Sequence, residues 1–390
     1  MAAFNEQEYR QRLARVRTRM RDKGFSVLLC PSPDNMNYLT GYDGWSFYLH
    51  QCVVIGLDRE NPLWFGRSTD INVAQSTPVL TSGDVYPYPD DYIQSTTHHP
   101  YDFVAKVLHD AGWSKAVVGI DMDSYYFSPA ALDALQRNLP HASFVDAGHL
   151  VNWLRVLKSP AEIECMRRAA SIAVASMNAG VATISTASRK CDTAAAILHA
   201  QARGAQEFGG EYTAIAPFIL NGEGTATPHI TWSDERYVQA KSVVIEIAGS
   251  YCRYHYPLAR TIFLGHPPQE RLEAMQAIIT GLGEALKAAV PGSLCEEIEA
   301  AWRSEIKRHG FEKRGRIGYS VGLGYPPDWG EHTLSIRPGD RTVLESGMTI
   351  FLIPALWGEK WSIGIGETFH ITDDGAIRFT DIPFDIIVKN

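Results

Sequence analysis

The sequence predicts two domains, an α/β domain over residues 1–155 followed by an α+β domain over residues 156–390. Three observations support this division. Segments of helical period alternate with short apolar strands through the first part of the chain. A strong helix-start signal follows near residue 159. Beyond residue 213, strands and turns predominate around two helical stretches. A length of 390 residues also suits two domains of ordinary size.

The first domain is expected to open with a helix over residues 5–23, because Leu13, Val16 and Met20 recur at helical spacing. The apolar run at 25–30 predicts a buried strand that ends at Pro31. The remaining predicted elements are strands at 51–57 and 116–120 and helices at 100–111 and 128–138. This alternation is typical of an α/β sheet domain.

The second domain is expected to open at a capped helix. Ser159 can accept from the first free backbone N–H groups, Pro160 suits the first turn, and Glu162 completes a capping box. The helix is predicted to run to about Ala182, and a second to begin near Cys191. The later predicted elements are helices at 268–289 and 295–309 and strands at 349–353, 367–371 and 376–379.

Composition narrows the class of protein. The net charge of -8 argues against a nucleic-acid binder, which usually carries a basic face. No run approaches the roughly 18 apolar residues of a membrane span, and the polar N-terminus lacks the apolar centre of a secretion signal. The 6 cysteines are scattered without a C-x-x-C pair, which is typical of free thiols in a reducing compartment. We therefore expect a cytoplasmic protein without a zinc cluster.

Four ordered motifs carry a family resemblance. They are Lys158-Ser159-Pro160-Ala161-Glu162-Ile163, the segment 243–265 with its Ala259-Arg260-Thr261 string, Pro291-Gly292 before a helix, and 342–348. In this order and spacing the chain resembles the creatinase and aminopeptidase superfamily over nearly its whole length. The resemblance implies a creatinase-like N-terminal α/β domain and a C-terminal catalytic domain of the α+β pita-bread fold.

The peptidases of this superfamily hold two metal ions with five side chains, and most of those positions have changed here. The two aspartate positions fall on Glu246 and Pro257, the histidine on Tyr319, and the two glutamates on Ile353 and Glu367. Two carboxylates without a bridging partner are too few donors for a dinuclear site. We therefore expect no bound metal, no other cofactor, and no metal-dependent peptide hydrolysis.

The altered positions resemble those of the ectoine hydrolases, a metal-independent group on this fold. The matching strings are 35–47, 254–261 and 324–332. That resemblance implies opening of the cyclic amidine ring of ectoine to N-acetyl-L-2,4-diaminobutyrate. It also implies a homodimer, a small-molecule substrate and a downstream deacetylase. The catalytic histidine position of creatinase falls on His229, and a second active-site histidine on His332.

The expected roles follow from the chemistry of an amidinium, a planar cation with an electrophilic carbon. Glu246, or a water that it activates, attacks that carbon. Glu367 binds the cation through charge-assisted hydrogen bonds, and His229 serves as the general acid–base. His332 and Tyr319 orient the substrate or stabilise developing charge. Four aromatic residues are expected to bind it, partly by cation–π attraction: Trp45, Phe47, Trp329 and Tyr254.

Three other functions stay open at this point. One is a creatinase-like amidinohydrolase acting on another guanidino or amidino compound, although a creatinase glutamate position falls on Ala259. A metal-dependent, proline-directed aminopeptidase is disfavoured by Pro257 and Tyr319. A non-catalytic binding protein is disfavoured by the polar residues that persist at active-site positions. Glu246 is the sharpest of these, because a carboxylate inside the apolar strand 243–247 is costly unless it has a function or a partner.

Overall fold

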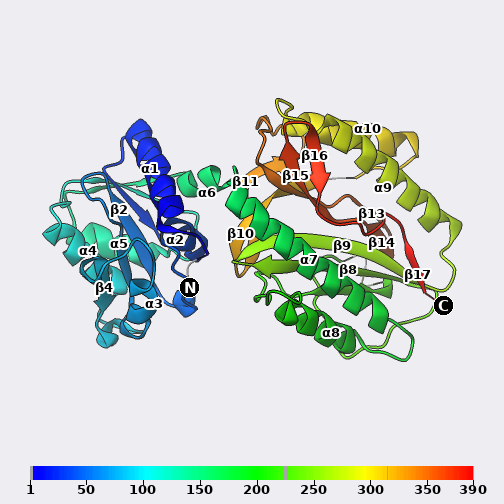
Figure 1. The fold of residues 1–390 in the computed structure, drawn as a ribbon, viewed down its shortest axis with the longest axis horizontal. Coiled ribbons are helices and arrows are strands. Elements are labelled where there is room, and N and C mark those ends of the chain that lie inside the picture. Colours follow the sequence, from blue (N-terminus) through cyan, green and yellow to red (C-terminus); the bar gives the residue numbers. More distant parts are fainter. Residues whose placement is uncertain (1–2, 224–226, 314, 390) are drawn as a thin grey trace. The chain divides into compact units, whose positions relative to one another are not determined.

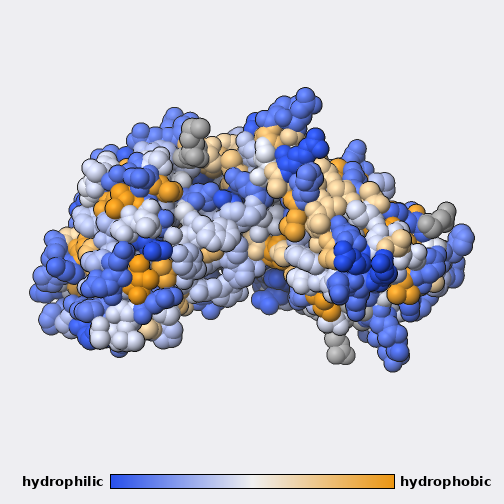
Figure 2. Space-filling view, turned by 90° about the horizontal axis from the view of Figure 1, so that it is seen from below, coloured by the Kyte–Doolittle hydropathy of each residue, from blue (hydrophilic) through white to orange (hydrophobic). Residues whose placement is uncertain are grey.

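The computed structural model describes residues 3–223, 227–313 and 315–389. The chain divides into two compact units, Met1–Leu154 and Arg155–Asn390. Figure 1 shows a sheet with helices in each unit. None of the helices that the structure describes is long and apolar enough to cross a membrane. In the space-filling view hydrophilic side chains predominate, and apolar side chains form separate small patches (Figure 2).

The first unit contains a mixed sheet of six strands in the order β4-β3-β2-β1-β5-β6. Parallel pairs β1–β5, β5–β6 and β3–β4 flank the antiparallel pairs β1–β2 and β2–β3. The strands are β1 (Val27–Cys30), β2 (Cys52–Gly56), β3 (Leu63–Arg67), β4 (Val85–Tyr88), β5 (Val117–Ile120) and β6 (Ser143–Asp146). The α-helices are α1 (Glu6–Lys23), α2 (Pro33–Thr40), α3 (Ile71–Gln75), α4 (Pro100–Asp110), α5 (Pro129–Asn138) and α6 (Leu150–Arg155).

The helix ends of the first unit follow from local chemistry. Asn5 caps α1 by accepting from the Glu8 N–H, and Gly24 ends it in the left-handed region at φ 75°. The predicted strand does end before Pro31, and the helix α2 that follows was not predicted from the sequence. Pro33 occupies the first turn of that helix, where its missing N–H costs nothing.

The second unit is built on a nine-stranded sheet with two helix pairs. Its main path is β16-β15-β12-β10-β9-β8-β7, with β11 added to β10 and β17 added to β9. The helices are α7 (Pro160–Thr183), α8 (Lys190–Arg203), α9 (Gln269–Ala288) and α10 (Cys295–Arg308). The strands are β7 (Phe218–Asn221), β8 (Ser242–Tyr251), β9 (Tyr254–Leu264), β10 (Gly318–Tyr325), β11 (Asp328–Ile336), β12 (Thr349–Leu352), β13 (Ala355–Gly358), β14 (Trp361–Gly364), β15 (Glu367–Thr372), β16 (Gly375–Arg378) and β17 (Ile387–Lys389).

The capping box at the start of α7 is present as expected. The Glu162 carboxylate accepts from the Ser159 N–H at 2.8 Å, and the Ser159 hydroxyl accepts from the Glu162 N–H at 3.4 Å. The helix lies along β8 and β9 (Figure 1). Gly249 makes this approach possible, because a Cβ there would stand 2.0 Å from the carbonyl oxygen of Ala169. Close helix–sheet packing therefore holds the central hairpin in place.

The hairpin of β8 and β9 has a continuous antiparallel register. Ten antiparallel pairs run from Ser242↔Phe263 to Tyr251↔Tyr254. The turn residues Cys252 and Arg253 both have positive φ, 51° and 64°, as a two-residue type I′ turn requires. This register places Glu246 opposite Ala259.

Candidate active site

A cavity of about 310 Å³ lies within the second unit, between the β8–β9 hairpin and the short β13–β14 hairpin. Its size suits a small organic molecule. Three of the five predicted catalytic residues line it: His229, Glu246 and Tyr319. They come from separate parts of the chain, namely the loop before β8, the strand β8 itself and the start of β10. The fold therefore brings these three side chains together at one pocket.

The alternation of β8 explains why Glu246 faces this pocket. Side chains of successive strand residues point to opposite faces of a sheet. Val243, Ile245 and Ile247 are fully buried on one face, whereas Val244 and Glu246 line the cavity on the other. The carboxylate thus interrupts an apolar strand at a position that opens onto a ligand-sized space.

The surroundings of Glu246 disfavour its charged form. Burial, followed by the negative charge of Asp328, raises the pKa of Glu246 to about 7. Asp328 itself stays ionised. Burial opposes its charge, but hydrogen bonds from the His332 ring and the Gly330 N–H outweigh that cost and lower its pKa. Two carboxylates with pKa values pushed apart are a recurring arrangement in acid–base catalysis.

Tyr319 is held in place by an aromatic neighbour. Trp329 Nε1 donates a hydrogen bond to the Tyr319 hydroxyl oxygen at 3.1 Å. Burial, together with the charge of Glu246, raises the pKa of the Tyr319 hydroxyl. The hydroxyl is therefore neutral at physiological pH, with its oxygen fixed by Trp329 and its own proton available for donation into the pocket.

His229 stands at the exposed side of the cavity. The residue has a left-handed backbone, φ 64°, and its ring centroid lies 5.7 Å from that of Phe218 on β7. Phe218 is paired with Glu246 across β7 and β8. Non-glycine residues with positive φ are uncommon, and they gather at functional sites. An exposed imidazole bordering the pocket has access to both ligand and water.

Glu367 does not line this cavity. Its carboxylate contacts Tyr256 and Arg260 of β9. Because side chains alternate along a strand, these two residues point to the face opposite to that of Ala259. Arg260 Nη2 donates to Glu367 Oε2 at 2.6 Å, and the hydroxyls of Tyr256 and Thr380 donate to Oε1 at 2.9 and 2.8 Å. The structure therefore does not bring Glu367 into the cavity, and its expected contact with the amidinium stays a prediction.

Five more predicted residues lie outside the lining. Tyr254 is buried, and its hydroxyl donates to Glu162 Oε1 at 2.6 Å, so the structure does not place it at the cavity. Trp329 is fully buried behind Tyr319 and contacts the pocket through that residue. His332 contacts the site through Asp328, with 3.3 Å between Nε2 and Oδ2. Trp45 and Phe47 belong to the first unit, where their ring centroids are 4.8 Å apart.

Sequence reasoning missed two cations and one aromatic residue in the pocket: Lys313, Arg316 and Trp357. Burial lowers the pKa of Lys313 to about 8. A basic run at 313–316 was the only signal in the sequence. Such a run usually marks a solvated surface, so the pattern did not distinguish these residues from ordinary exposed charges.

The donors present do not fit a pair of metal ions. Among residues 3–223, 227–313 and 315–389, no group of three or more His, Cys, Asp or Glu side chains is arranged to hold a metal. Pro257, which pairs with Ala248 two positions from Glu246, offers no side-chain donor. The carboxylate of Glu367 is committed to Arg260. A dinuclear site needs several oxygen or imidazole ligands converging on one point.

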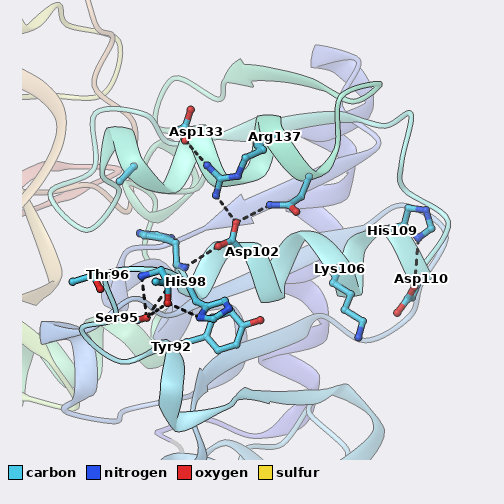
Figure 3. A pocket seen from close by; sticks show the side chains of 14 residues that line it. Tyr92, Ser95, Thr96, His98, Asp102, Lys106, His109, Asp110, Asp133 and Arg137 are labelled. Carbon is cyan, nitrogen blue, oxygen red and sulfur yellow. Dashed lines mark hydrogen bonds and ion pairs between the residues drawn. The ribbon is translucent and has the colours of Figure 1, made fainter.

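A second cavity, of about 980 Å³, lies in the first unit (Figure 3). Its charges are largely paired with one another. Arg137 contacts both Asp102 and Asp133 at 2.7 Å, and His109 lies 3.4 Å from Asp110. Asp102 also accepts from the His99 N–H at the start of α4. These contacts cap and tie the helices α4 and α5 together, so this depression is a weaker candidate for a catalytic centre.

Comparisons with known proteins match the two units of the chain to two family models. Residues 164–373 match the model of metallopeptidase family M24, and residues 12–157 match the creatinase/prolidase N-terminal domain. The chain is 43% identical to an ectoine hydrolase of Halomonas elongata, covering 99% of this chain and 98% of that protein. It is 40% identical to the hydrolase/peptidase y4tM of Sinorhizobium fredii, over 99% of each chain.

A solved structure supports the architecture. The prolidase of Thermococcus sibiricus superposes with a TM-score of 0.85, 18% identity, and coverage of 98% of this chain and 99% of that one. At this identity the likeness concerns the fold alone, and it confirms the predicted pita-bread domain behind a creatinase-like N-terminal domain. The chain belongs to metallopeptidase family M24 and carries the creatinase/prolidase type of N-terminal domain ahead of its pita-bread domain.

Proposed function

We propose that this chain is a metal-independent hydrolase that opens the cyclic amidine ring of ectoine to N-acetyl-L-2,4-diaminobutyrate. The observation that carries the proposal is Glu246, a carboxylate with a pKa of about 7 facing a small cavity in a sheet that lacks the family's metal donors. The 43% identity to an ectoine hydrolase over nearly the full length supports the choice of substrate.

The pocket offers the groups that amidine opening needs. Ionised Glu246 attracts the amidinium cation and stands ready to attack its carbon, which bears the methyl group. Tyr319 donates a hydrogen bond that fixes the orientation of the ring. Attack forms a C–O bond, and His229 gives a proton to the ring nitrogen that departs as its C–N bond breaks.

The second half of the reaction restores the enzyme. Water adds to the same carbon, with His229 accepting its proton, and the Glu246 carboxylate leaves. The carbon and its methyl group remain on the other nitrogen as an acetyl group. If Glu246 activates a water in the first step instead, the product is the same. Intact-protein mass spectrometry after an acid quench separates the two routes, because only direct attack adds the mass of the substrate to the enzyme.

The test of the function is incubation of EDTA-treated protein with ectoine, creatine and a proline dipeptide, with products identified by mass spectrometry. The expected result is ring opening of ectoine alone, at an unchanged rate after chelation. Glu246→Gln should abolish it, while Glu273→Gln, an exposed glutamate on α9, serves as the matched control. Dipeptide cleavage that is lost on chelation would contradict the proposal and favour a metallopeptidase.

Two expectations about partners accompany this function. We infer a homodimer in which Trp45 and Phe47 of one subunit reach the other subunit's pocket, and a deacetylase that acts on the acetylated product. Support comes from the 56% exposure of Trp45, which is unusual for so large an aromatic side chain. A dimer by analytical ultracentrifugation, with a raised KM in Trp45→Ala, is expected. A monomer with full activity would overturn this part.

A further inference from the structure

Two cations line the same cavity as Glu246, and they create an imbalance of charge. Lys313 and Arg316 come from the segment between α10 and β10. Among the lining residues that the structure describes, Glu246 is the one carboxylate against these two positive side chains. Two cations against one carboxylate give the lining a net positive charge, which the ionised Asp328 close to Glu246 and Arg316 partly offsets. A ligand carrying only positive charge would fit such a pocket poorly.

The ammonium group of Lys313 lies near two tryptophan rings and has protons that are not used in hydrogen bonds within the protein. Its Nζ lies 5.1 Å from the ring centroid of Trp357 and 5.8 Å from that of Trp302. Its hydrogen bond to the Ile353 carbonyl oxygen is long, 3.4 Å, and uses one of three ammonium protons. The nearby carboxylate of Glu299 is paired with Arg303 instead. Within the described part of the chain, no acidic side chain forms an ion pair with Lys313.

Arg316 is positioned by the catalytic tyrosine. Its guanidinium carbon lies 4.2 Å from the ring centroid of Tyr319, a cation–π contact. One Nη1 proton reaches Ser335 Oγ at 3.4 Å. Among the residues that the structure covers, Arg316 has no carboxylate within ion-pair distance. A guanidinium stacked on a ring, with its fork open, is suited to a planar carboxylate.

We propose that Lys313 and Arg316 form a subsite for the carboxylate of a zwitterionic substrate, opposite the Glu246 end that takes its amidinium. This inference rests on the proposed function and deepens it by naming what selects the substrate. The dipolar pocket favours a small cyclic amidine that carries a carboxylate over one that lacks it. Recognition of the carboxylate also fixes which way the ring enters, so that the amidine carbon meets Glu246.

The first test compares ectoine with 2-methyl-1,4,5,6-tetrahydropyrimidine, which keeps the cyclic amidine and lacks the carboxylate. Lys313→Met and Arg316→Gln should each raise the KM for ectoine by about 10- to 100-fold, the scale of a lost hydrogen bond to a charged group. We expect kcat to change much less. The kcat/KM for the analogue, already low, should stay within about twofold, because no carboxylate contact is lost. Lys307→Met, an exposed lysine on α10, is the control.

These readouts separate a binding role from a structural one. A merely structural Lys313 would lower kcat/KM for both compounds alike, and that result would overturn the subsite. Unchanged melting temperatures verify that the variants fold. Wild-type turnover of ectoine with unaltered KM in both variants would also overturn the subsite, while leaving the proposed function intact.

The second test needs no turnover. Propionate, an unreactive carboxylate, is titrated while tryptophan fluorescence is followed, because Lys313 lies close to Trp302 and Trp357. We expect saturable binding by the wild type and about tenfold weaker binding by Lys313→Met. If the protein does not open ectoine but shows this difference, the subsite stands and the proposed substrate falls. Equal propionate binding by both proteins would overturn the subsite.

Discussion

Glu367 on β15 and Arg260 on β9 form a fully buried ion pair, with 2.6 Å between Oε2 and Nη2. Arg260 also donates to the Gly366 carbonyl oxygen at 2.7 Å, next to the isolated bridge between Ala259 and Gly366. The pair therefore joins two strands that are far apart in the sequence. A Cβ at Gly366 would stand 2.7 Å from that of Ala259, so the strands meet closely beside the pocket.

Loss of this ion pair should cost stability before it costs chemistry. Glu367→Ala leaves the Arg260 guanidinium buried without its partner, so the free energy of unfolding should fall by about 3–5 kcal/mol. Urea denaturation measures this change. The double variant Glu367→Met with Arg260→Met should be destabilised by less than the two single changes together, since it leaves no lone charge. A stable Glu367→Ala protein that has lost turnover would instead restore Glu367 as a catalytic residue.

Glu246→Gln should remove activity and yet stabilise the protein at alkaline pH. The folded state raises the pKa of this carboxyl from 4.5 to about 7, so folding is penalised once the pH exceeds the unfolded value. The penalty grows as pH rises to about 7 and is constant above it. Glutamine carries no such penalty. We expect the variant to be more stable by about 3 kcal/mol at pH 8 and equal to the wild type near pH 4.

Thermal or urea unfolding of both proteins at the two pH values checks the linkage. The control is Glu273→Gln, whose exposed side chain should show no pH-dependent difference. Equal stability of Glu246→Gln and wild type at pH 8 would mean that the carboxylate is well solvated, and the argument for its raised pKa would fail.

The pH dependence of turnover should report the same group. Glu246 must be ionised to attack or to activate water, so kcat/KM for ectoine should rise with pH through about 7. It should fall again above pH 8, where Lys313 loses its charge and the KM rises. Bound amidinium stabilises the carboxylate, which places the corresponding limb of kcat at a lower pH. Steady-state kinetics between pH 5 and pH 9 in one buffer mixture test both limbs. A falling kcat/KM across pH 6 to 7 would assign Glu246 the role of an acid.

Local signals in the sequence were sufficient for most of the helices. Ser159, Pro160 and Glu162 act within one turn, and the start of α7 lies where they place it. Glu246 and Glu367 were both placed by the family's ligand positions, and only for Glu246 did an apolar strand add a second argument. The structure pairs Glu367 with Arg260, 107 positions away. Pairing of distant strands decides which face of β15 a side chain occupies, and no local period contains that information.

The cations of the pocket show a second limit. Lys313 and Arg316 lie in a connecting segment, where a basic run has no periodicity to place it. Their importance comes from the side chains that fold against them, Trp357 and Tyr319. Both contacts are with residues that are distant in the sequence or belong to another element. No local sequence pattern indicates them, so these cations could be identified only from the folded structure.

Tyr319 and Trp329 should act as one unit in catalysis. Tyr319→Phe removes the donor to the substrate, and a loss of about 100-fold in kcat is expected on the scale of a single stabilising donor. Trp329→Phe leaves the hydroxyl without its 3.1 Å anchor and should lower kcat by about tenfold. Because Trp329 acts through the hydroxyl, the double variant should be no slower than Tyr319→Phe alone. If the losses in kcat of the two single variants instead multiply in the double variant, Trp329 has a role independent of Tyr319. The variant Trp153→Phe, which replaces an exposed tryptophan, is the control.

Lys313 should set the alkaline limit of substrate binding. Its pKa of about 8 results mainly from burial, with Glu299 raising it and Arg316 lowering it, and Glu246 faces the same cavity. Loss of the ammonium proton removes the charge that we assign to the substrate carboxylate, so the KM for ectoine should rise above pH 8 while kcat stays nearly level. Lys313→Arg keeps a charge to far higher pH, and its KM should be flat across this range. If the KM of the wild type is equally flat up to pH 10, the charge of Lys313 does not contribute to substrate binding. At that pH the wild-type lysine is neutral, whereas the arginine of the variant is still charged.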